Sequence, residues 1–239
     1  MKRRPVLVAS LLGLLAPPVS AEKPMKSDDA LTAVELKRMT VTQGKLESLP
    51  NGRLVIEEPK VRAVATSVPS REAPGVQALT GQALRASEAV EARVAELRFT
   101  YLGATREQKP LASGELRRQV GLKLRARDGC NVVYVMWRIE PKPGLVVSVK
   151  SNPGQHRSDD CGNGGYQTVK PRTKARVPGL EPGDSHTLRA ELQGAVLKVR
   201  VDGESVWEGT LPAEALSFDG PVGLRTDNGR FQVELLSAP

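Results

Sequence analysis

Three consecutive segments of the chain predict strands joined by short turns, which form a meander. The first and third carry polar side chains at alternate positions, a spacing that puts them on one face of a β-sheet, whereas the second is apolar on both faces and is expected in the middle of the sheet. The segments are residues 115–127 (ELRRQVGLKLRAR), 130–139 (CNVVYVMWRI) and 145–150 (LVVSVK). Amides, guanidinium groups and aromatic rings can hydrogen-bond to sugar hydroxyls and stack on sugar rings. The pattern predicts a sugar-binding sheet face; the alternative is a solvated face whose long side chains cover apolar neighbours. The residues expected on this face are Gln119, Lys123, Arg125, Tyr134, Arg138, Ser148 and Lys150.

A long loop, residues 151–177, follows the third segment and is expected at the rim of the same face. It would add Asn152, His156 and Tyr166 to the ligand contacts. Carboxylate and amide oxygens at positions 159, 160 and 163 suit a hard cation, so a calcium site is one alternative, although the spacing matches no defined calcium loop. The other alternative is ordinary turn chemistry beside a disulfide.

The chain has two cysteines, Cys130 and Cys161. An even number in an exported protein predicts a disulfide; the alternatives are two free thiols or an intermolecular bridge. A closed loop of about 30 residues would contribute roughly 3–4 kcal/mol in the chain-entropy model. Two cysteines and two distant histidines do not have the spacing of a zinc site, so we predict no zinc and no cofactor, with calcium as the alternative given above.

Residues 1–21 have the pattern of a cleaved signal peptide. Lys2, Arg3 and Arg4 precede an apolar run at residues 6–16, and residues 19–21 (VSA) form a small-residue cleavage site. The run is too short to cross a bilayer, and no later run approaches the ~20 residues that a spanning helix needs. We expect a secreted or periplasmic protein with no transmembrane segment.

The charge of the chain is modest. Loss of the three leader cations lowers the formal charge from +8 to +5. The basic residues are interleaved with acidic ones and form no run of five or six. Such a balance favours loose association with acidic polysaccharide or membrane, and the familiar nucleic-acid motifs are absent. We therefore expect a glycan or polysaccharide partner and no nucleic acid.

The rest of the chain predicts an all-β sandwich with little helix. Further strands are expected at residues 39–46, 53–56, 61–67 and 90–102, and residues 69–87 fit either a loop or an edge strand. Residues 22–38 are a polar lead in which a short helix is expected to run from residues 27–29 through Arg38. Residues 39–239 then form a single domain. Trp137 and Trp207 are expected mainly in its core, and His186 in a structural role.

The closing stretch, residues 186–236, predicts five strands separated by turns. Its specific parts are residues 197–203 (LKVRVDG), 206–208 (VWE), 220–225 (GPVGLR) and 227–229 (DNG). Asp202-Gly203 suits a tight type I′ hairpin. This run, and with it roughly residues 39–236, resembles the concanavalin A-like lectin and glucanase (laminin-G-like) jelly rolls. Within that superfamily it is most similar to bacterial domains grouped with 3-keto-disaccharide hydrolases and to laminin-G-like lectin modules.

The resemblance implies two antiparallel sheets and a glycan bound on a concave sheet face. Family 16 glycosidases share the fold but carry a Glu-x-Asp-x-Glu strand, which supplies two carboxylates about 5 Å apart. No such pattern occurs here, because Glu57 and Glu58 are adjacent and would point to opposite faces. We expect a lectin-like binding protein. The alternatives are a hydrolase or lyase acting on a modified disaccharide, with His156 or an acidic loop residue as base, and a structural envelope protein.

Overall fold

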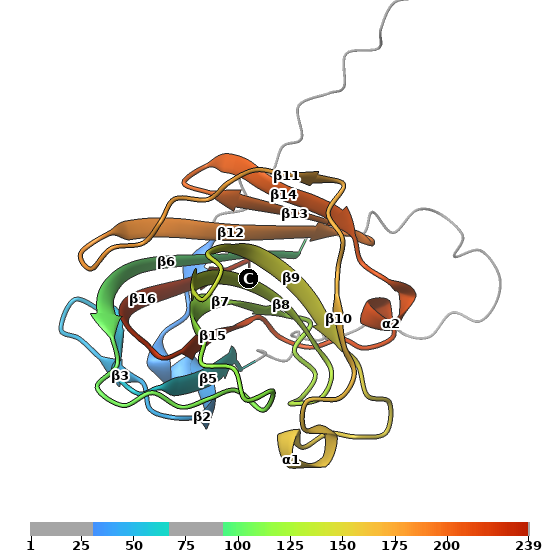
Figure 1. Ribbon diagram of the computed structural model, residues 1–239, viewed down its shortest axis with the longest axis horizontal. Helices are drawn as coiled ribbons and strands as arrows, with labels where there is room; N and C mark the ends of the chain where they lie inside the picture. Colours follow the sequence, from blue (N-terminus) through green and yellow to red (C-terminus); the bar gives the residue numbers. More distant parts are fainter. Residues whose placement is uncertain (1–30, 67–92, 239) are drawn as a thin grey trace, which may run out of the picture.

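The computed structural model describes residues 31–66 and 93–238, and in this part of the chain two antiparallel sheets face each other (Figure 1). The seven-stranded sheet has the order β10 (Tyr166–Thr168), β9 (Gly144–Lys150), β8 (Val132–Glu140), β7 (Arg118–Leu124), β15 (Gly223–Asp227), β5 (Lys60–Ala65) and β2 (Met39–Gln43). The predicted meander of three strands is confirmed, and β8 lies within the sheet with partners on both sides.

The second sheet has nine strands. Its order is β11 (Thr173–Lys174), β14 (Glu204–Thr210), β13 (Val196–Val201), β12 (Ser185–Gln193), β6 (Arg93–Ala104), β16 (Gly229–Ser237), β4 (Leu54–Ile56) and β3 (Glu47–Ser48), with β1 (Thr32–Ala33) also paired to β16. Together the two sheets confirm the predicted all-β jelly-roll sandwich.

Alternate side chains of both sheets form one apolar core between them. Leu122, Val135 and Val147 face inwards from neighbouring strands of the seven-stranded sheet. Trp137 is fully buried with its ring edge-on to Phe99, and Trp207 is equally buried, so both tryptophans belong to the core as expected. The consequence for function is that the opposite face of the seven-stranded sheet carries polar side chains around a small apolar cluster that includes Tyr134 and Met136.

The closing strands follow the predicted order, β12 to β16. Asp202 and Gly203 both have positive φ (51° and 86°), as a type I′ hairpin requires. His186 lies beside Asp202, with 2.6 Å between Nδ1 and Oδ2, and packs on Trp137, in agreement with a structural role. A short helix, α2 (Ala213–Leu216), interrupts the loop between β14 and β15 and was not predicted.

The N-terminal prediction was wrong where the structure describes it. Instead of a helix running through Arg38, β1 extends the nine-stranded sheet and a single 3-10 turn, η1 (Leu36–Arg38), follows. Pairing of two residues with the last strand outweighs the weak helical spacing of this stretch. The leader at residues 1–21 and the ambiguous segment at 69–87 lie outside the described residues. In the described ranges, no helix has the length and apolar character needed to cross a membrane.

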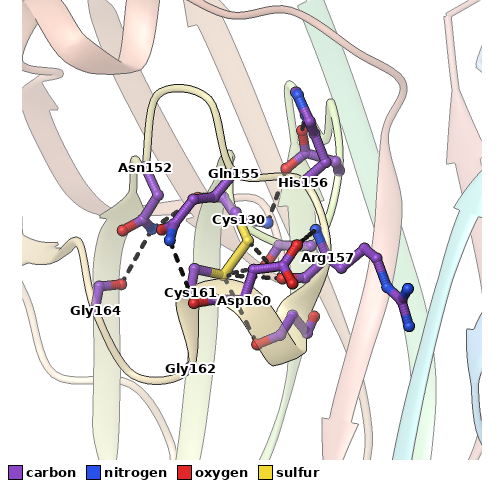
Figure 2. The surroundings of a disulfide bond; sticks show 12 residues. Cys130, Asn152, Gln155, His156, Arg157, Asp160, Cys161, Gly162 and Gly164 are labelled. Atoms are coloured by element: carbon purple, nitrogen blue, oxygen red, sulfur yellow. Dashed lines mark hydrogen bonds and ion pairs between the residues drawn. A yellow bond between two sulfur atoms is a disulfide. The ribbon is translucent and has the colours of Figure 1, made fainter.

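The predicted disulfide is confirmed: Cys130 and Cys161 are bonded, with their Cα atoms 5.9 Å apart. The bond joins the residues just before β8 to the short helix α1 (Ser158–Cys161) (Figure 2). Asn152 strengthens the same junction, because its Nδ2 donates to the carbonyl oxygens of Cys130 and Gly164 (both 3.2 Å). The long loop is thereby held against the end of the seven-stranded sheet.

Candidate ligand-binding groove

The outer face of the seven-stranded sheet is hollowed into a groove of about 1020 Å³. The strands form its floor, while residues 110–117 and the disulfide-linked loop form its walls. Asn228 holds the first wall, because its Nδ2 donates to the carbonyl oxygens of Lys109 (3.0 Å) and Arg117 (2.9 Å). Eight of the ten residues proposed as ligand contacts line the groove: Gln119, Lys123, Tyr134, Arg138, Ser148, Lys150, His156 and Tyr166.

Strand register arranges the floor in cross-strand rows. One polar row contains Lys123, Tyr134 and Ser148, which are paired across β7, β8 and β9. A second polar row contains Gln119 and Arg138. The row between them is Gly121, Met136 and Val146, so an apolar strip separates the two sets of hydrogen-bonding groups. Such a strip suits the C–H surface of a sugar ring, with polar groups on either side to meet its hydroxyls.

An arginine of β15 reaches across β7 to a tyrosine of β8. Arg225 is paired with Gly121, and its guanidinium carbon lies 4.8 Å from the ring centroid of Tyr134, one strand further on. Its Nη1 also donates to the hydroxyl of Tyr166 (3.4 Å). The rings of Tyr134 and Tyr166 are stacked with centroids 6.1 Å apart, and Tyr166 is 41 % exposed. Tyr134 is therefore a buried part of the floor, whereas Tyr166 presents an accessible aromatic surface.

A buried carboxylate anchors the cationic side of the floor. Asp227 is fully buried and accepts hydrogen bonds from Arg225 Nε (2.8 Å), Arg62 Nη2 (2.6 Å) and Gln119 Nε2 (2.7 Å). Burial opposes ionisation of this carboxyl, but the two guanidinium charges outweigh it and hold the pKa of Asp227 below its usual 3.8. The same carboxylate keeps the pKa of Arg225 above its ordinary value despite burial.

Two other cations of the floor have no such partner. Lys123 is 5 % exposed and makes no hydrogen bond or ion pair with any described residue. Burial, together with the charges of Arg62 and Arg225, lowers the pKa of Lys123 to about 8. The Nε of Arg138 is buried and likewise without a partner in the described ranges. Both groups line the groove with donor capacity that the protein itself does not satisfy.

The rim residues have mixed roles. The ammonium of Lys150 donates to the carbonyl oxygens of Gly129 (3.2 Å) and Gly162 (2.9 Å), so it fastens the loop to the sheet. His156 is exposed, with Nδ1 2.8 Å from Oδ2 of Asp128. Burial acts against the charge of Asp128, but this contact and nearby amide donors lower the pKa of its carboxyl below the usual value.

Two of the proposed contacts lie outside the groove. The side chain of Asn152 is engaged in joining the loop to Cys130, as described above. Arg125 has φ of 50°, which ends the alternation of β7 and turns its side chain away to the carbonyl oxygens of Ala215 (3.0 Å) and Phe218 (2.9 Å) near α2. Its predicted place on the ligand-binding face was wrong, because strict alternation does not continue through a residue in the left-handed region.

Sequence reasoning missed the residues of β15 and β5. Arg225 and Asp227 alternate with inward-facing Leu224, so the sequence contained a signal that both point outwards. The sequence analysis assigned these residues only to turns and to the fold. Arg62 alternates in the same way on β5. Whether these strands lie beside β7 depends on the order of strands in the sheet, which local spacing does not reveal. In the described ranges no group of three or more His, Cys, Asp or Glu side chains is placed to hold a metal ion.

Comparisons with known proteins support the fold but do not establish a function. No protein-family profile and no curated protein matches the sequence. Among solved structures, a variant of the Emp46p carbohydrate recognition domain is similar with a TM-score of 0.50 and 11 % identity, over 84 % of this chain and 88 % of that one. The carbohydrate-binding module CBM66 from Bacillus subtilis gives 0.49 and 12 %, over 82 % and 91 %. The likeness to the Emp46p domain agrees with the jelly-roll sandwich seen in the structure.

Proposed function

We propose that the protein is an exported carbohydrate-binding protein that takes a glycan in the groove of the seven-stranded sheet. The observation that carries this proposal is the layout of the floor: two polar rows flank an apolar strip, with the half-exposed ring of Tyr166 at one side. Sugars present both hydroxyls and apolar C–H faces, and this combination meets both. That the similar Emp46p domain is named for carbohydrate recognition agrees with it.

Export is supported by two independent features. The first is the charged and apolar pattern of residues 1–21, and the second is the disulfide between Cys130 and Cys161, which persists in oxidising compartments. A secreted or periplasmic location would also bring the protein to polysaccharides outside the cytoplasm.

The test is a broad glycan array probed with the purified, oxidised protein, with and without calcium. We expect a specific hit that is weakened at least tenfold by Tyr166→Ala, which removes the exposed ring. Val196→Ala is the matched control, because Val196 is an exposed apolar side chain of the nine-stranded sheet. No hit in either condition, or equal loss in both variants, contradicts the proposal.

The contact between His156 and Asp128 favours a second function, a hydrolase or lyase acting on a modified disaccharide. A carboxylate bound at Nδ1 leaves Nε2 of the imidazole to act as a general base, and His156 lines the groove. Turnover of a bound glycan that His156→Ala abolishes, with binding retained, would establish this activity. Binding without turnover would leave the lectin-like function alone.

A further inference from the structure

The groove has a strong excess of positive charge. Nine Lys or Arg side chains line it, against three carboxylates. Two of the three are already engaged, Glu115 by Arg117 and Asp128 by His156. The buried carboxylate of Asp227 beneath the floor still leaves most of these cations without an anion. The basic residues of the chain form no run in the sequence, so this concentration is created by the fold.

The cations of the floor are of two kinds. Arg225 and Arg62 both pair with Asp227 and shape the site, whereas the side chains of Lys123 and Arg138 have no partner in the described part of the chain. The unpaired ammonium of Lys123 lies on a residue that is only 5 % exposed, which is unfavourable for the free protein because the charge keeps little of its water and has no anion beside it. An anion supplied by a ligand would satisfy it, and the planar fork of Arg138 suits a carboxylate or sulfate group.

We infer that the ligand of the groove is an acidic oligosaccharide, whose carboxylate or sulfate groups bind Lys123 and Arg138; this rests on the proposed carbohydrate-binding function. The register sets the length of the ligand. Lys123 is paired with Tyr134, and Arg138 lies four residues further along β8. At about 3.4 Å per residue the two positions are roughly 14 Å apart along the sheet. A ligand that reaches both is longer than one sugar ring and carries at least two charges.

The experiment is a calorimetric titration of the oxidised protein with charged and uncharged forms of the same glycan. One pair is tetragalacturonate and its full methyl ester, and the other is a sulfated carrageenan tetrasaccharide and its desulfated, neutral form. We expect the charged member of at least one pair to bind at least about tenfold more tightly, since one charge-assisted contact contributes this much or more. The pair that responds identifies the acidic group.

Variants at two positions of the groove, with a control elsewhere, distinguish a specific binding site from non-specific electrostatic attraction. Lys123→Met should weaken binding of the charged form at least tenfold, and Arg138→Gln should do the same while Arg138→Lys retains part of the affinity. Lys198→Met removes the same charge from the outer face of the nine-stranded sheet and should change binding less than about threefold. Urea unfolding of each variant verifies that it is folded.

The outcomes distinguish failure of the acidic-ligand inference from failure of the carbohydrate-binding proposal. If neutral glycans bind in the groove as tightly as acidic ones, the inference is overturned while the carbohydrate-binding proposal stands. If Lys123→Met and Lys198→Met weaken acidic binding equally, the attraction is non-specific and the inference is also overturned. If no glycan of either class binds, both proposals fail.

Discussion

Replacement of Asp227 by asparagine tests whether one carboxylate holds the groove floor together. The substitution keeps the shape of the side chain but removes the charge that Arg225 and Arg62 share. It also places an amide group against the donor of Gln119. Removing one partner from a buried ion pair costs about 3–5 kcal/mol. For a domain of this size that corresponds to a fall in Tm of roughly 6–20 °C.

Urea unfolding at pH 7, followed by the fluorescence of the buried Trp137 and Trp207, measures this loss directly. Asp219→Asn is the matched control, because Asp219 pairs with Arg93 at the surface, where such a pair contributes at most about 1 kcal/mol. If Asp227→Asn costs no more than the control, Asp227 is not the anchor that the structure indicates.

The pH dependence of the difference in unfolding free energy between wild type and Asp227→Asn gives an independent test. The pKa of Asp227 lies below its usual 3.8 in the folded protein, so its stabilisation is present above pH 3.8 and is lost as the pH falls through the folded value. The difference between wild type and Asp227→Asn should therefore be constant near neutrality and shrink below pH 3.8. A difference that persists unchanged into strong acid would contradict ionisation as its cause.

Three further predictions concern stability. Lys123→Met should raise the unfolding free energy at pH 7 by up to about 3 kcal/mol, because the lysine pKa falls from 10.5 to about 8 on folding; the gain should vanish as the pH rises from 8 to 10.5, where wild type folds with a neutral amine. Reduction of the Cys130–Cys161 bond, which closes a loop of 31 residues, should cost about 3–4 kcal/mol in urea unfolding and weaken glycan binding at the rim. Gly121→Ala should cost about 1–3 kcal/mol, because the added Cβ would lie 2.1 Å from the carbonyl oxygen of Val135, whereas Gly179→Ala meets nothing and should be neutral. Each prediction has an outcome that would contradict it: Lys123→Met is less stable than wild type, reduction leaves stability unchanged, or Gly121→Ala is more stable than wild type.

The expected gain from Lys123→Met has a functional meaning. A residue that destabilises the free protein, and whose removal abolishes ligand binding, marks a site where stability is sacrificed for function. If the variant is both more stable and fully able to bind, Lys123 has no part in recognition.

The sequence was sufficient for most of the fold and for the central part of the groove. Alternation in β7 and β9, with short turns on either side of the apolar β8, placed Gln119, Tyr134 and Ser148 on one face because adjacent strands of a meander must pair. The same reasoning failed at Arg125, where a positive φ breaks the period. Periodicity describes a strand only as far as its backbone remains extended.

The rest of the site depends on contacts between distant parts of the chain. Asp227 meets Gln119 across a separation of 108 residues and Arg62 across 165. The tripeptide at residues 227–229 looked like a simple turn, yet Asp227 holds the floor and Asn228 holds a wall of the groove. Such roles follow from the order of strands in the sheet, and that order is not encoded in local spacing.

The most direct test of the account is a crystal structure of the oxidised protein with the oligosaccharide that binds best on the array. The account predicts a glycan lying across β7, β8 and β9, with its ring on Met136 and Val146 and an acidic group within hydrogen-bonding distance of Lys123 or Arg138. A glycan bound on the outer face of the nine-stranded sheet, with the groove left to solvent, would contradict it.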